Sequence, residues 1–102
     1  MIKIYDATAI IDGRLYDTSI AKEIFSHEKI PEKIFIMPKG DYFTVRTKWS
    51  GETELTDKGE IFRSHFGYTN ISPISKKDVM DIVEQLDKSK FKELFPNNID
   101  VK

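Results

Sequence analysis

The chain has 102 residues, with 16 Lys or Arg against 17 Asp or Glu, so its formal net charge is -1. This length suits one domain spanning residues 1–102, and the 12% of aromatic residues supplies enough apolar bulk to argue against disorder. The absence of Cys excludes a disulfide scaffold, a thiolate zinc site and a cysteine nucleophile, and the balanced charge argues against a general nucleic-acid coat protein.

The first predicted unit is a β-hairpin. Residues 2–5 and 8–11 are β-prone, and Asp12-Gly13 follows them. Gly tolerates the positive φ of a tight hairpin turn, so residues 14–16 should form the return strand.

A helix is predicted next, over about residues 18–27. Asp17, Thr18 and Ser19 are typical helix N-cap residues. Apolar residues then recur at helical spacing, and the helix should end before Pro31.

Residues 33–37 and 42–49 are rich in β-branched and aromatic residues and flank the turn-forming segment 38–41, which predicts an antiparallel hairpin. For residues 55–70 two interpretations stay open. One is a short helix from Thr56-Asp57 to Gly67, weakened by the internal Gly59, and the other is strand and loop.

The C-terminal region predicts an extended connector over residues 71–74 and an amphipathic helix over about 76–87, which Ser75 caps. A second short helical turn should follow around Phe91 and end before Pro96, with a frayed tail over about 97–102.

These elements predict an α+β domain, in which a small antiparallel sheet from two hairpins packs against two or three helices on one face. A homodimer through an exposed sheet edge is an alternative state. The expected core residues are Ile4, Ile10, Leu15, Ile20, Ile24, Ile36, Phe43, Val45, Phe62, Val79, Ile82, Val83 and Leu86.

The sequence offers no catalytic motif. His27 and His65 stand in no metal-binding spacing, and the many carboxylates mostly lie where turns and caps favour Asp. We therefore expect no enzyme activity, no cofactor and no bound metal. The first residues resemble no secretory signal and no apolar run reaches membrane-spanning length, so we expect a cytoplasmic protein without a membrane contact.

Candidate partner-binding residues combine aromatic and basic side chains. If Phe43 and Val45 face the core, then Tyr42, Thr44, Arg46 and Lys48 share the other strand face, which could stack RNA or single-stranded nucleic acid or contact a protein. An ordinary solvated sheet face is the competing interpretation. The full candidate set is Tyr42, Arg46, Lys48, Trp49, Arg63, Lys88 and Lys90.

Three stretches carry a resemblance to a known group of proteins. They are Gly13-Arg14-Leu15-Tyr16-Asp17-Thr18, Lys39-Gly40-Asp41-Tyr42-Phe43 and Ile71-Ser72-Pro73-Ile74-Ser75-Lys76-Lys77-Asp78. Their order resembles small uncharacterised proteins of phages, plasmids and integrative elements in Gram-positive bacteria. The Gly-rich stretch usual in that family is reduced here to Ser50-Gly51, and its usual Glu-Trp is replaced by about Val83-Glu84.

This resemblance implies an inhibitor of host defence, with type II-A anti-CRISPR proteins as the nearest functional class. The expected partner is a host protein or ribonucleoprotein complex in the bacterial cytoplasm, most of all a type II CRISPR–Cas effector nuclease or its guide-RNA assembly. Guide-RNA channels are strongly basic, so a nucleic-acid mimic should be strongly acidic. The net charge of -1 disfavours mimicry and favours shape-specific binding.

Overall fold

A computed structural model of the chain describes residues 4–98, with backbone alone at residues 50–54, 56, 61–65 and 98. In chain order the elements are β1 (Ile4–Tyr5), β2 (Thr8–Ile11), β3 (Arg14–Asp17), β4 (Lys22–Phe25), β5 (Glu32–Ile36), β6 (Tyr42–Thr56), β7 (Gly59–Ile74), α1 (Lys76–Leu86), α2 (Lys88–Leu94) and a 3-10 turn, Pro96–Asn98. Residues 97–98 of the tail that was expected to fray belong to this turn, and residues 99–102 lie outside the described residues.

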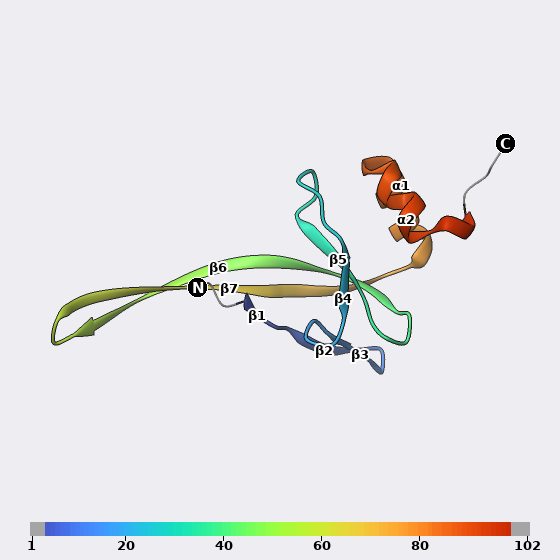
Figure 1. The fold of residues 1–102 in the computed structure, drawn as a ribbon. Coiled ribbons are helices and arrows are strands. Elements are labelled where there is room, and N and C mark those ends of the chain that lie inside the picture. Colours follow the sequence, from blue (N-terminus) through green and yellow to red (C-terminus); the bar gives the residue numbers. More distant parts are fainter. Residues whose placement is uncertain (1–3, 99–102) are drawn as a thin grey trace.

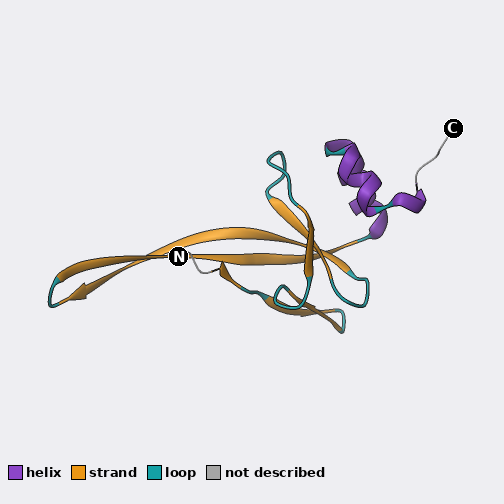
Figure 2. Ribbon diagram, in the orientation of Figure 1, coloured by secondary structure: helices purple, strands orange, loops and turns teal. Residues whose placement is uncertain are grey.

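The α+β class is confirmed, and the arrangement of the strands differs from the prediction (Figure 2). The main sheet has five strands in the order β1-β7-β6-β5-β4, and β2 and β3 form a separate two-stranded sheet. β1 runs parallel to β7, whereas the other neighbours are antiparallel. The first predicted hairpin, β2–β3, is thus separate from the main sheet, since β2 and β3 pair only with each other.

Both predicted hairpins are present. Asp12 and Gly13 adopt positive φ angles of 51° and 76° at the β2–β3 turn, as a tight hairpin turn requires. In the β5–β6 turn, the backbone N–H of Met37 donates to the carbonyl of Asp41 over 2.8 Å.

The helix predicted over residues 18–27 is wrong. Residues 22–25 form β4 and pair with β5, with a bulge between Glu23 and Phe25. The polar residues before them make turn contacts instead of a helix cap, since Asp17 Oδ1 accepts from the backbone N–H of Ser19 over 2.8 Å. Pairing with a neighbouring strand therefore overrides the local helical spacing.

The helix considered within residues 55–70 is also wrong, and the strand alternative is confirmed. Thr56 and Gly59 close the turn between β6 and β7, and Gly59 has a φ of 120°. β7 continues to Ile74, so the expected connector 71–74 is its last part. The two helices at the end are confirmed, with Ser75 capping α1 by accepting from the backbone N–H of Asp78 over 3.1 Å.

The main sheet is covered on both faces rather than on one. Phe25 and Ile34 pack with Val79, Val83 and Phe91 of the two helices in a first core. Phe35, Phe43 and Val45 pack with Tyr16 of the β2–β3 hairpin in a second core. Alternation of side chains along the strands sends neighbouring residues to the two cores.

The expected core list is therefore corrected. Phe43, Val45, Val79 and Val83 are buried, and Ile24, Ile36, Ile82 and Leu86 are half-buried. Ile10, Leu15 and Ile20 are exposed, because the β2–β3 hairpin and the turn after it each have an outer face. Ile4 is exposed on β1, at the edge of the main sheet. The side chain of Phe62 lies outside the described residues. The buried residues that were not expected are Tyr16, Phe25, Ile34, Phe35, Met37, Phe91 and Phe95.

The longest strands leave the body as a projecting hairpin (Figure 1). β6 has 15 residues and β7 has 16, and the molecule measures 69 × 31 × 17 Å. β5 pairs with β6 only up to Arg46, and β1 pairs with β7 only at Phe66 and Gly67. Residues 47–66 therefore form what we call the arm.

Candidate functional site

An exposed apolar row crosses the base of the arm. Phe66 of β7 is paired with Ile4 of β1 on one side and with Trp49 of β6 on the other. The rings of Trp49 and Phe66 have centroids 4.6 Å apart, so both side chains lie on the same face. Ile4 is 45% exposed and Trp49 is 56% exposed, which makes this row (Ile4, Phe66 and Trp49) the most prominent uncovered apolar surface of the arm base.

The apolar row continues the second core onto the arm. Thr47 is paired with Tyr68, whose ring contacts Phe35 of that core in an edge-on arrangement with centroids 5.4 Å apart. Trp49 and Phe66 lie two residues further along their strands and therefore on the same face. The β2–β3 hairpin covers the core part of this face, and the row lies beyond Tyr68 toward the arm.

The predicted aromatic and basic strand face is only partly brought together. Alternation in β6 is as expected, but Tyr42 packs against the first core beneath the helices. Arg46 forms an ion pair with Glu32, with Nη2 and Oε1 3.0 Å apart. Lys48 is exposed at the start of the arm, while Trp49 lies on the opposite face. Tyr42 and Trp49 therefore do not form one stacking platform.

The remaining candidates lie elsewhere. Arg63 is opposite Glu52 in the arm, and its side chain lies outside the described residues. Lys88 and Lys90 belong to α2, which Figure 1 shows at the end of the molecule away from the arm tip. Lys90 Nζ lies 3.4 Å from a carboxylate oxygen of Glu93. Lys88 and Lys90 therefore do not form a common surface with Trp49.

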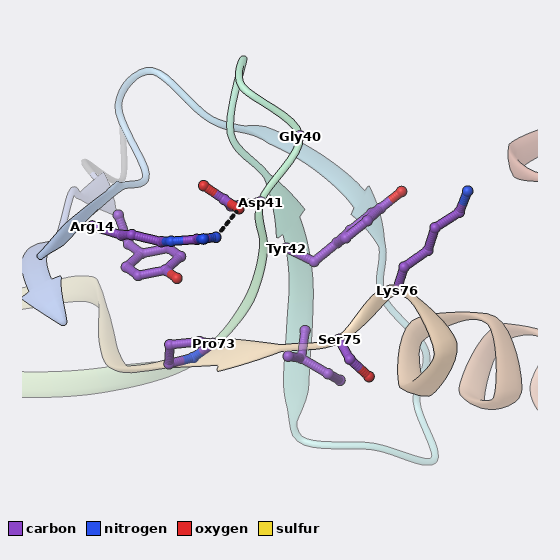
Figure 3. Close-up of a pocket in the computed structure, with 9 residues that line it drawn as sticks. Arg14, Gly40, Asp41, Tyr42, Pro73, Ser75 and Lys76 are labelled. Atoms are coloured by element: carbon purple, nitrogen blue, oxygen red, sulfur yellow. Dashed lines mark hydrogen bonds and ion pairs between the residues drawn. The ribbon is translucent and has the colours of Figure 1, made fainter. Parts of the chain in front are cut away.

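A pocket of about 450 Å³ lies where the β5–β6 turn meets the start of α1 (Figure 3). Arg14 Nη1 and Asp41 Oδ1 are 2.7 Å apart on one side of it, and Tyr42 separates this pair from Lys76 in the view of Figure 3. Ser75, which also lines it, caps α1 with its hydroxyl oxygen. The Arg14–Asp41 ion pair thus joins the two hairpins, while Ser75 stabilises the start of the helix.

Among the side chains that the structure describes, Asp17 and Tyr68 have pKa values shifted from their ordinary values. Hydrogen bonds from the hydroxyl and the backbone N–H of Ser19 lower the pKa of Asp17. Burial raises the pKa of Tyr68, and the negative charge of Glu23 raises it further. Tyr68 packs against the second core, and Asp17 stabilises the turn that follows β3.

Among the side chains that the structure describes, no group of three or more His, Asp or Glu residues is placed to hold a metal ion. Across the same part of the chain, no helix is both long and apolar enough to cross a membrane.

Sequence reasoning found Trp49 and missed its neighbours. Ile4 was assigned to the core, and Phe66 fell in the segment left open between a short helix and strand and loop. Only the pairing of β1, β7 and β6 places them beside Trp49. The one available signal was the Phe66-Gly67-Tyr68 run, which is typical of a strand with aromatic residues on one face.

Comparison of the chain with protein-family models, with curated proteins and with solved structures finds no match to any of them.

Proposed function

We propose that this protein is a non-enzymatic binding protein that docks its apolar row on a partner protein and thereby inhibits it. The observation that carries this proposal is the exposure of Trp49 at 56% beside Phe66 and Ile4, on a rigid strand framework. Exposed apolar groups of this kind mark interaction surfaces, and Trp is among the residues that contribute most to binding energy at interfaces.

The shape of the arm supports a protein partner. The arm projects from a molecule 69 Å long, and the apolar row lies at its base, so a partner that contacts the row can also contact the arm along its length. Its strands fix the positions of the aromatic rings before binding, which reduces the entropy lost on association. A projecting hairpin with an aromatic row at its base is well suited to fill a surface that a larger effector needs for its own moving parts.

The partner class that we propose is a host defence complex, foremost a type II CRISPR–Cas effector or its guide-RNA assembly. The resemblance to mobile-element proteins motivates this choice, and the mixed charge fits shape-specific contact better than imitation of nucleic acid. The protein would act in the cytoplasm of the bacterial host.

The test is to mix the purified protein with guide-loaded type II effectors and to measure DNA cleavage, guide loading and co-elution. Inhibition that is lost in Trp49→Ala and retained in Lys77→Ala supports the proposal. Lys77 is an exposed residue of α1, remote from the arm, and serves as the matched control. No inhibition and no co-elution across several effectors would remove this partner class.

A second candidate function is binding of single-stranded nucleic acid. The exposed Trp49, whose ring contacts the half-buried Phe66, favours it, because bases stack on exposed aromatic rings. Lys48 on the other face of β6 and the ion pair of Arg46 with Glu32 supply little free positive charge. Fluorescence anisotropy with an oligonucleotide pool tests it, since binding to phosphates must weaken as salt rises.

A further inference from the structure

The outer edge of β6 is the longer of the two strand edges that the arm leaves without a neighbouring strand. In the described part of the chain, β5 occupies this edge only up to Arg46, and no strand pairs with it from Thr47 to Thr56. The inner edge of β6 is paired with β7, whose own outer edge is paired with β1 at Phe66 and Gly67. A strand edge of this length is a template for another strand, and a two-stranded hairpin without further neighbours is only marginally stable in water.

We propose that the arms of two copies pair through this edge, with β6 running antiparallel to β6 of the second copy and Gly51 on the two-fold axis. In this register Lys48 of each copy lies opposite Glu54 of the other, so one geometry creates the same opposite-charge pair twice. Opposite charges directly across a strand pair stabilise it, and like charges destabilise it.

The length of the free edge selects this register. Centring on Gly51 aligns Thr47 with Leu55 of the second copy, which uses the free edge from its first residue. Thr56 is then the one β6 residue of the second copy that lies opposite Arg46, where β5 ends. Centring on Ser50 would instead pair Lys48 with Glu52 and would bring three residues, 54–56, alongside the part of β6 that β5 already occupies. Of the two registers that place Lys48 opposite a Glu of β6, centring on Gly51 therefore overlaps β5 less.

The same register also joins the exposed apolar residues of the two arms. Trp49 and Leu55 are odd-numbered positions of one strand and share a face, and each is exposed in the single chain, Leu55 to 80%. Trp49 of one copy becomes a diagonal neighbour of Leu55 of the other, within reach of an indole ring. The resulting sheet has the order β7-β6-β6-β7 and carries two apolar rows on one face.

Charge reversal tests the register. Sedimentation of the wild-type protein over a range of concentrations should show a monomer–dimer equilibrium. Lys48→Glu and Glu54→Lys should each raise the dimer dissociation constant about tenfold or more, because each places like charges opposite one another twice. The double variant should restore dimerisation, and Lys77→Glu on α1 should leave it unchanged. A wild-type protein that stays monomeric, or a double variant that fails to recover, overturns the proposal.

A disulfide trap tests the axis. The chain has no Cys, so Gly51→Cys introduces a unique thiol. Residues opposite each other on an antiparallel axis have Cα atoms about 4.5–5.5 Å apart, which permits a disulfide. Thr53→Cys is the matched control, because its two copies would be about 13 Å apart along the strands. Air oxidation should cross-link Gly51→Cys and spare Thr53→Cys, and equal cross-linking of both contradicts the register.

This dimer does not depend on the proposed function. Sedimentation and cross-linking use the protein alone, whereas the proposed function is measured by cleavage and co-elution with an effector. A monomeric protein that inhibits an effector would overturn the dimer only, and a dimer without any inhibition would overturn the proposed partner only. Pairing of the edge with a strand of a different protein would show as a wild-type monomer, which also overturns the dimer.

Discussion

Ile34 and Phe35 are consecutive residues of β5, and they are buried on opposite faces of the sheet. Ile34 is fully buried against the two helices, while Phe35 is 3% exposed against the β2–β3 hairpin. The sheet is therefore the middle layer of the body. Each of its faces needs its own cover, and each cover comes from a different end of the chain.

Truncation of either residue should destabilise the protein strongly. Ile34→Ala should lower the free energy of unfolding by about 2–5 kcal/mol and Phe35→Ala by about 3–5 kcal/mol, because each leaves a cavity in a closed core. Urea unfolding followed by circular dichroism measures both. Ile10→Ala is the matched control, since Ile10 is 75% exposed and should cost about 0.5 kcal/mol or less. A loss for Ile10→Ala as large as that for Phe35→Ala would mean that the outer face of the hairpin is covered.

The single Trp of the chain should report on the arm. Trp49 is 56% exposed, so its fluorescence should be red-shifted, typical of a hydrated indole, and accessible to a soluble quencher. Burial of the apolar row by a partner should shift the emission to shorter wavelength and reduce quenching. Titration of the partner while recording emission measures this. A blue-shifted and unquenched emission in the dilute protein alone would contradict the exposed position of Trp49.

The sequence predicts the hairpins and the last helices because their signals are local. Asp12-Gly13 needs only its own positive φ angles, and Ser75 caps the helix that begins beside it. The helix predicted over residues 18–27 fails for the opposite reason, since pairing of Phe25 with Ile34 is a contact between segments that local spacing does not encode. The sequence does not predict the apolar row for the same reason, because Ile4 and Phe66 are 62 positions apart (66 minus 4) and are brought together only by parallel pairing of β1 with β7.

Asp87 should stabilise the junction between α1 and α2 through its backbone N–H and its carboxylate. Its backbone N–H donates to the carbonyl of Val83 over 2.8 Å at the end of α1, and its carboxylate accepts from the backbone N–H of Lys90 over 3.0 Å at the start of α2. Asp87→Ala removes only the second bond and should cost about 0.5–2 kcal/mol. Asp87→Asn keeps an acceptor and should cost less. Thermal unfolding compares them, and an equal loss in both variants would show that charge, not capping, is responsible.

The raised pKa of Tyr68 should make the protein lose stability in alkali. Burial of the ring raises the pKa of Tyr68 because it disfavours the phenolate, and the negative charge of Glu23 raises this pKa further. The ammonium group of Lys33, whose Nζ lies 3.1 Å from Oε1 of Glu23, lowers it. The folded state therefore keeps the phenol proton at a pH where the unfolded chain has released it. The stability linked to this group is complete below the unfolded pKa of about 10 and declines as the pH rises through and above that value.

Tyr68→Phe isolates this contribution, because Phe keeps the ring that contacts Phe35 and removes the titrating hydroxyl. The free energy of unfolding should be measured for both proteins from about pH 8 to about pH 11. The wild-type protein should lose stability relative to Tyr68→Phe only in the upper part of this range, where the unfolded phenol ionises. A constant difference between the two proteins across the whole range would show that Tyr68 ionises equally easily in both states, and its ring would then be in contact with water.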